Sequence, residues 1–322
     1  MASGPSAWEG GSTFDLVVWG DPSFDTIVVP LAEVVEDQRM PALISDHLGG
    51  SGANVAAQAA ELGLSVGLVG AVGRDEVGAK VVEQLERSGV RGLMVQCKTT
   101  RRTISISGRG GTRTMFGEDS DQYEASYASV EEEWKRSSAK VVHLSLTSVM
   151  RSSTDWSVEC TNSFRRHGSE VSLDLGNAPE LAARGGNWVD GIMQLIRPRV
   201  VFANEHEIGH LRDVSRETLA GVEVVIKQGG AVASVVVDGT VVTELLPSKV
   251  ADVVDTTGAG DVFTAGYLLA RLAGVSYDQR LGFAHLTASW SIRSHGAGVA
   301  PEHLDEVLAV RPSAVPPSST PP

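Results

Sequence analysis

The sequence DTTGAGD, residues 255–261, is the stretch from which the fold and the chemistry can be inferred. Apolar residues follow it at helical spacing from Val262 to Leu272, so the glycine-rich turn is predicted to stand at the N-terminus of a helix. Backbone amides at such an end carry partial positive charge, and glycine lets a phosphate approach them closely. The stretch therefore predicts an anion hole formed by Gly258, Ala259 and Gly260.

Asp261 stands at the rim of this predicted anion hole. Its carboxylate would repel a phosphate, but it could accept the proton of a hydroxyl group that attacks the phosphate. We interpret Asp261 as a catalytic general base. An ordinary glycine turn with Asp261 as a helix cap would explain the same residues, so the interpretation depends on the rest of the chain.

Short apolar runs alternate with helical patterns over most of the chain, which is typical of crossover connections and predicts an α/β fold with a mainly parallel sheet. Two stretches, 27–47 and 102–116, break this rhythm and are predicted to form a small separate sheet, because polar and apolar residues alternate from Thr103 to Ser107. The apolar runs are Leu16–Trp19, Val66–Val69, Val141–Leu144, Val171–Leu173, Val200–Ala203, Val224–Ile226 and Val232–Val237.

Composition excludes several classes of protein. A formal net charge of −13 argues against a nucleic-acid-binding surface, and no apolar run is long enough to span a membrane. The two cysteines, Cys97 and Cys160, lack metal-type spacing and indicate reduced thiols in a cytoplasmic protein. Residues 1–13 are expected to be a flexible leader, and residues 312–322, with five prolines and three serines, a disordered tail.

A second glycine-rich stretch, GGSGANVA at residues 49–56, lies near the N-terminus. Together with DTTGAGD it resembles the two signatures of the PfkB (ribokinase-like) family of carbohydrate kinases, and the likeness extends over about residues 16–301. The resemblance implies a three-layer α/β/α sandwich in a kinase domain of residues 14–311. It also implies a small β-sheet lid over the active site, formed from about 25–48 and 101–117.

The resemblance implies roles for further residues as well. Those matched to substrate-binding positions are Asp25, Gly50, Ser51 and Asn54. Those matched to the nucleotide site are Asn204, Glu207, Lys227, Gly229, Gly258 and Gly260, and Glu207 would hold Mg²⁺ through water. Asp255 and Thr257, with the Gly296 loop, match positions that hold a potassium ion in many members.

Two departures from the family pattern bear on the acceptor. Ser51 stands where many ribokinases and sugar-phosphate kinases carry lysine, and the segment Leu144–Ser148 lacks the acidic sugar ligand of ribokinases. The first departure favours a neutral acceptor over a phosphorylated sugar, and the second weakens a strict assignment to ribose.

We therefore expect a kinase that transfers the γ-phosphoryl group of ATP, with Mg²⁺, to a hydroxyl of a small neutral sugar or polyol. A nucleoside kinase is the main alternative, with Phe24 and Phe116 as candidates for contacting the base. A non-catalytic sugar- or nucleotide-binding regulator would not need Asp261. A nicotinamide-dependent dehydrogenase is disfavoured, because Gly20 is not followed by the G-x-G-x-x-G pattern. Several family members dimerise through their lids, which implies a homodimer here.

Overall fold

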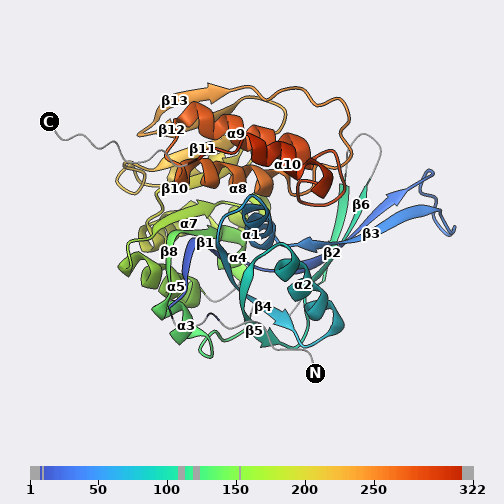
Figure 1. Ribbon diagram of the computed structural model, residues 1–322, viewed down its shortest axis with the longest axis horizontal. Helices are drawn as coiled ribbons and strands as arrows, with labels where there is room; N and C mark the ends of the chain where they lie inside the picture. The colour runs from blue at the N-terminus through green and yellow to red at the C-terminus, as the bar shows by residue number, and fades with distance from the viewer. Residues whose placement is uncertain (1–7, 9–10, 108–112, 119–123, 152–153, 314–322) are drawn as a thin grey trace.

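A nine-stranded sheet forms the centre of the computed structural model, which describes residues 8, 11–107, 113–118, 124–151 and 154–313 (Figure 1). Seven adjacent strands, starting at one edge of the sheet, are parallel. The two strands at the opposite edge are antiparallel to their neighbours. From that parallel edge the order is β5 (Arg91–Cys97), β4 (Val66–Gly73), β1 (Thr13–Trp19), β8 (Ser138–Ser145), β9 (Glu170–Asp174), β10 (Val200–Asn204), β11 (Glu223–Lys227), β12 (Ala233–Val237) and β13 (Thr240–Leu245).

Helices cover both faces of this sheet, because most of its strands are apolar on both sides. In β1, for example, Leu16 and Val18 belong to one core cluster, and Val17 and Trp19 to the other. The first face carries α1 (Ser51–Glu61), α2 (Glu76–Arg87), α8 (Ala259–Leu272) and α9 (Tyr277–Ser291), with α10 (Pro301–Ala309) packed beside α9. The second carries α3 (Glu131–Arg136), α4 (Leu146–Arg151), α5 (Thr154–Arg166), α6 (Ala178–Arg184) and α7 (Gly186–Ile196).

The predicted three-layer α/β/α sandwich is thus confirmed, and each predicted apolar run lies in a strand of the sheet, except that Val232 precedes β12 by one residue. Two strands were not predicted. The edge strand β13 exposes Val241 and Val242, so it lacks the fully apolar run of its buried neighbours. Strand β5, at the other edge, begins and ends with polar or partly exposed residues.

A four-stranded sheet projects from the sandwich as the predicted lid (Figure 1). Its strands are β3 (Ala42–Gly49), β2 (Ser23–Pro30), β6 (Arg102–Ser107) and β7 (Arg113–Gly117), in that order. The β2–β3 and β6–β7 pairs are antiparallel, whereas β2 and β6 run parallel. Asp25 pairs with both His47 and Thr103, so these three side chains share one face of the lid. His47 lies against Gly296, which shows that this face is turned toward the loop between α9 and α10.

Trp8 is buried, although it falls in the segment expected to be a flexible leader. Its indole packs against Phe14, with ring centroids 4.7 Å apart, and donates a hydrogen bond to the Arg91 carbonyl oxygen. The aromatic contact ties this point of the chain to β1, and the hydrogen bond ties it to β5. Residues 1–7 and 9–10 of the expected leader, and 314–322 of the expected tail, lie outside the described residues.

Within the described part of the chain, no helix combines the length and the apolar character that crossing a membrane requires.

Candidate active site

The glycine turn stands where the sequence predicts, at the start of α8. Gly258 has a left-handed backbone (φ +69°), and a Cβ there would come within 2.0 Å of the Ala297 Cβ, so only glycine fits. The amides of Ala259 and Asp261 donate within the turn, to Thr256 O (3.3 Å) and Gly258 O (2.9 Å). For Ala259, this internal bond competes with the predicted contact to an anion.

Two side chains of α1 hold the carboxylate of Asp261. The Ser51 hydroxyl donates to Oδ1 at 2.7 Å, and the Asn54 amide nitrogen donates to Oδ2 at 2.9 Å. Asn54 is buried, and its own Oδ1 has no hydrogen-bond partner among the described residues. Burial raises the pKa of Asp261 to about 6, although the Asn54 and Ser51 hydrogen bonds and the charge of Lys227 act in the opposite direction. The carboxylate is therefore oriented, largely ionised at neutral pH and close to the optimum for a general base.

Lys227 lies at the end of β11, on the other side of the glycine turn. Its ammonium donates to Asp174 Oδ2 at 2.5 Å and to the Thr264 hydroxyl at 3.4 Å. A Cβ at Gly260 would stand 3.6 Å from the same nitrogen. Burial works to lower the pKa of Lys227, but the carboxylates of Asp174, Glu207 and Asp261 together outweigh this effect and hold the pKa above its ordinary value. A permanent positive charge therefore borders the predicted anion hole.

Asn204 and Glu207 form a closed loop of hydrogen bonds after β10. The Glu207 carboxylate accepts from the Asn204 backbone amide (2.9 Å) and side-chain amide (2.6 Å), and the Asn204 Oδ1 accepts from the Glu207 amide (3.0 Å). Burial, with Asp174 nearby, raises the pKa of Glu207 to about 7. No cluster of three His, Cys, Asp or Glu side chains that could cage a metal occurs among the described residues. A single carboxylate of this kind fits Mg²⁺ held mainly by water and phosphate oxygens.

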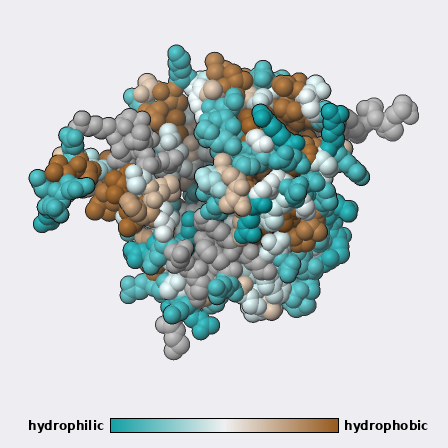
Figure 2. All heavy atoms as spheres, turned by 180° about the vertical axis from the view of Figure 1, so that it is seen from behind, coloured by the Kyte–Doolittle hydropathy of each residue, from teal (hydrophilic) through white to brown (hydrophobic). Residues whose placement is uncertain are grey.

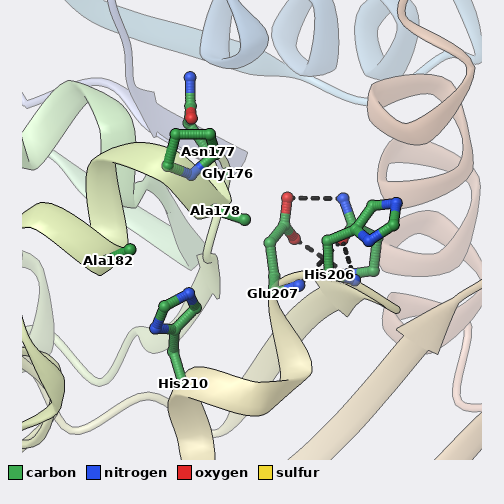
Figure 3. A pocket seen from close by; sticks show the side chains of 9 residues that line it. Gly176, Asn177, Ala178, Ala182, His206, Glu207 and His210 are labelled. Carbon is green, nitrogen blue, oxygen red and sulfur yellow. Dashed lines mark hydrogen bonds between the residues drawn. The ribbon is translucent and has the colours of Figure 1, made fainter.

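An open pocket of about 710 Å³ adjoins this loop (Figure 3). Its walls come from the segment after β9 and from the segment after β10, and Glu207 and His210 stand on the β10 side. Both segments follow carboxyl ends of parallel strands, which is where open α/β sheets bind ligands. The lining residues are Gly176, Asn177, Ala178, Pro179, Ala182, Asn204, His206, Glu207 and His210.

Asp255 ties the start of the glycine turn to the Gly296 loop. Its Oδ1 accepts from the Thr257 amide (2.9 Å) and hydroxyl (2.6 Å), and its Oδ2 accepts from the Gly296 amide (3.2 Å). These contacts bring together the three positions predicted to hold potassium. They also give Asp255 a structural role that needs no ion, so potassium binding stays a prediction.

The lid supplies Asp25, beside the start of α1. A Cβ at Gly49 would come 2.1 Å from Asp25 Oδ1, which shows how closely the carboxylate lies against the glycine pair. Burial raises the pKa of Asp25, and Ser23 and Arg101 oppose this effect. Gly50 (φ +90°) is explained differently from the prediction, because a Cβ there would collide with the Asp21 carbonyl oxygen at 2.1 Å. The space that glycine leaves at residue 50 is filled by the chain itself.

Comparison with known proteins identifies the family. Residues 15–304 match the pfkB family of carbohydrate kinases. The chain belongs to this family. It is similar to a nucleoside kinase of Methanothermobacter thermautotrophicus, with 28% identity over 304 residues covering 88% of this chain and 90% of the relative.

Solved structures share the fold of this pfkB-family chain. A probable sugar kinase from Rhizobium etli superposes with a TM-score of 0.77 at 22% identity, covering 92% of this chain and 99% of that chain. A putative ribokinase II from E. coli, solved in complex with ATP and Mg²⁺, gives a TM-score of 0.72 at 17% identity, with the same coverage. The resemblance inferred from the two glycine-rich motifs is thereby confirmed.

The structure gathers most of the predicted site residues of this pfkB-family chain around the glycine turn, and adds one that sequence reasoning missed. Ser51, Asn54 and Lys227 surround Asp261 or its helix, whereas Gly229 lies in an exposed turn after β11. The missed residue is Asp174, the partner of Lys227. Its position at the carboxyl end of a predicted buried strand was the available signal.

Proposed function

We propose that this chain transfers the γ-phosphoryl group of ATP to a hydroxyl of a small neutral sugar or polyol. The observation that carries the proposal is the orientation of Asp261: two donors from α1 fix its carboxylate at the N-terminus of α8, beside the glycine turn. Asp261 takes the proton of the acceptor hydroxyl as its oxygen attacks the γ-phosphorus. The amides of Gly258 and Gly260, with the α8 N-terminus, stabilise the charge on the transferred group.

Asn54 orients the acceptor together with Asp25. The Nδ2 of Asn54 is bound to Asp261, so its buried Oδ1 is left to accept a hydrogen bond from an acceptor hydroxyl close to the base. Asp25 supplies further hydrogen-bond acceptors from the lid. A non-catalytic regulator would have no need of a base held in this way.

Charge in the lid region favours a neutral acceptor. The nearby cation, Arg101, is paired with the buried carboxylate of Asp21 at 3.5 Å, and that carboxylate also accepts from the Ser148 hydroxyl at 2.7 Å. Ser51 stands at the position where many members carry lysine, and its hydroxyl donates a hydrogen bond to Asp261. An acidic acceptor would therefore meet carboxylates, because the charge of Arg101 is already paired with Asp21 and Ser51 is neutral.

A nucleoside acceptor remains the second candidate, since a protein that is similar to most of this chain bears the name nucleoside kinase. The two predicted base-contacting aromatics do not support it. Phe24 is buried in the core beside Lys80, and Phe116 is 57% exposed and pairs with Ile104, on the lid face opposite Asp25. A polyhydroxyl acceptor agrees better with the polar face made by Asp25 and its neighbours.

Magnesium would be held beside Glu207 through water and through the phosphates of the nucleotide. Its charge would screen the triphosphate from the carboxylates of the site. If so, E207Q should raise the Mg²⁺ concentration needed for half-maximal rate about tenfold, because replacing a residue that supports a metal ion commonly lowers the metal affinity by about this factor or more. A titration of initial rate against Mg²⁺ at fixed ATP measures this, and an unchanged midpoint would exclude Glu207 from the magnesium site.

The proposed function is tested by an ADP-release assay across a panel of acceptors. Neutral sugars and polyols should give turnover, and phosphorylated sugars should give at least about tenfold lower kcat/KM, which corresponds to roughly 1.4 kcal/mol. Nucleosides as the best acceptors would favour the second candidate. Absence of turnover with every class would contradict the kinase proposal itself. Repeating each active assay with and without K⁺ tests the potassium prediction.

The outer face of the lid is our proposed dimer interface. Ile44, Ile104 and Phe116 are 67%, 44% and 57% exposed, and their strand pairing places them on the face opposite Asp25. Apolar residues gather on the projecting lid in Figure 2, at the left. A second copy of the chain would cover such a face with the same residues. Sedimentation should give a dimer for the wild type and a monomer for I44D/F116D; equal masses would exclude this interface.

A further inference from the structure

Asp174 is the meeting point of three elements around the phosphoryl-transfer site. It ends β9, and its side chain is 4% exposed. Oδ2 accepts from the Lys227 ammonium of β11 at 2.5 Å and from the Thr264 hydroxyl of α8 at 3.3 Å. Oδ1 accepts from the Gly176 amide at 3.1 Å, in the segment that lines the pocket. Both oxygens are thus committed to protein donors, so Asp174 acts through its partners.

These contacts aim the ammonium of Lys227 at the glycine turn. An ammonium has three donors, and two of them are used by Asp174 and Thr264. The single hydrogen of the Thr264 hydroxyl is shared between Asp174 and the Gly260 carbonyl oxygen, which lies 3.0 Å away and links the arrangement to the first turn of α8. Among the described residues, no third hydrogen-bond acceptor is recorded for the ammonium, which also lies 5.7 Å from the centroid of the Phe202 ring. A phosphate oxygen in the anion hole could accept from the third donor.

We propose that Asp174 is a positioning residue for phosphoryl transfer: its carboxylate holds the Lys227 ammonium beside Gly260, where the ammonium binds the transferred phosphoryl group. The inference rests on the proposed function. It gives the Asp174–Lys227 ion pair a part in catalysis, in addition to joining β9, β11 and α8. If the ion pair were purely structural, replacing Asp174 and replacing Lys227 should have the same effects on the enzyme.

Asp174 and Lys227 have opposite effects on the pKa of Asp261, so their roles can be separated by experiment. The side chains that hold Asp261 from α1, Ser51 and Asn54, are uncharged. The charged groups that influence its pKa are Lys227 from β11, which lowers it, and Asp174 from β9, which raises it. Removing one charge should therefore move the ionisation of Asp261 in the direction opposite to removing the other.

The test compares D174N with K227M, which break the same ion pair from opposite ends. For D174N we expect kcat to fall about tenfold to hundredfold while KM for ATP changes less than about threefold, because the ammonium remains but is no longer aimed. Its acidic limb in the pH profile of kcat should move to lower pH. For K227M we expect KM for ATP to rise at least about tenfold, because a charged hydrogen bond to phosphate is lost, and the limb to move to higher pH.

The matched control is E223Q, which removes a buried carboxylate from an ion pair at the other end of β11 and α8. It should lower thermal stability without moving the acidic limb. The proposal is overturned if D174N behaves as E223Q does, or if D174N and K227M shift the limb in the same direction. Rescue of kcat by D174E would support it further.

Calorimetric binding of MgATP separates failure of this inference from failure of the proposed function. K227M should bind MgATP at least about tenfold more weakly than the wild type, and D174N within about threefold. If the wild type phosphorylates no acceptor, the kinase proposal fails, but unequal MgATP affinities of the two variants would still support the positioning of Lys227. Equal affinities of the two variants would overturn it.

Discussion

Helix α8 and strand β11 meet in two ionic clusters, one at each end of the helix. At the far end from the glycine turn, Glu223 accepts from the Tyr267 hydroxyl at 2.5 Å and from the Arg280 guanidinium at 3.2 Å. Arg271 bonds both Glu223 and Glu170. This far cluster contains two carboxylates and two guanidinium groups, so its charges balance.

The cluster at the glycine turn has the same kinds of contact without this balance. Asp174 raises the pKa of both Glu207 and Asp261, so this cluster sets three carboxylates against the single ammonium of Lys227. Burial raises the pKa of both Asp261 and Glu207, which shows that the excess negative charge is costly to keep ionised. We infer that the balanced cluster serves stability, whereas the excess of carboxylates in the unbalanced one suits a site beside a Mg²⁺ ion, whose positive charge would offset theirs.

Of the substitutions that distinguish the two clusters, D261N should have the largest effect, on kcat. Loss of a general base typically costs 10²–10⁴ in rate, so we expect kcat to fall about 10³-fold. Binding of MgATP and acceptor should stay within about threefold, because asparagine keeps the shape of the side chain and one acceptor oxygen. Single-turnover rates and calorimetry measure the two quantities. A variant that retains more than about a tenth of the wild-type rate would exclude Asp261 as the base.

The far cluster should respond to E223Q in stability alone. Removing one partner of a buried ion pair commonly costs 3–5 kcal/mol, and since the amide retains some hydrogen bonds we expect about 3 kcal/mol in the free energy of unfolding. At 25 °C the folded variant should keep kcat within about twofold, because distant sites are usually independent. Urea denaturation and steady-state rates provide the comparison. A large loss of kcat in a folded variant would mean that the two clusters are coupled through α8.

Much of the active-site end was predictable from sequence, because its chemistry lies in local motifs. The spacing after Gly258 gives the start of α8, and residues 49–56 give the start of α1, so the two motifs place Asp261 and Asn54 at helix ends. The alternating apolar runs likewise predict the parallel sheet. These features depend on neighbours in the chain, and local patterns are sufficient for them.

Pairings between distant residues were beyond such patterns. Asp174 and Lys227 are 53 residues apart, and nothing local to either shows that β9 and β11 flank the same strand. The hydroxyl of Ser51 was assigned to the substrate, whereas the packing of α1 against α8 brings it to Asp261. Burial of Trp8 has the same origin, since it depends on Phe14 and on the neighbouring strand that carries Arg91.

The smallest effect concerns the pH dependence of stability, and it tests the charge imbalance directly. The pKa of Asp261 is raised from 3.8 to about 6, so between these values the native state binds more protons than the unfolded state. Its contribution to stability is complete below pH 3.8 and is lost as the pH rises through about 6. D261N lacks this loss, so its stability relative to the wild type should increase by about 2 kcal/mol between pH 4.5 and pH 8.

Urea denaturation of both proteins at the two pH values isolates this term, because the raised pKa of Glu207 contributes to both and cancels in the difference. If D261N gains nothing on the wild type between pH 4.5 and 8, the carboxylate is not strained by burial. The contrast between the two ends of α8 would then rest on geometry alone, with Asp261 held by Ser51 and Asn54 but not poised electrostatically.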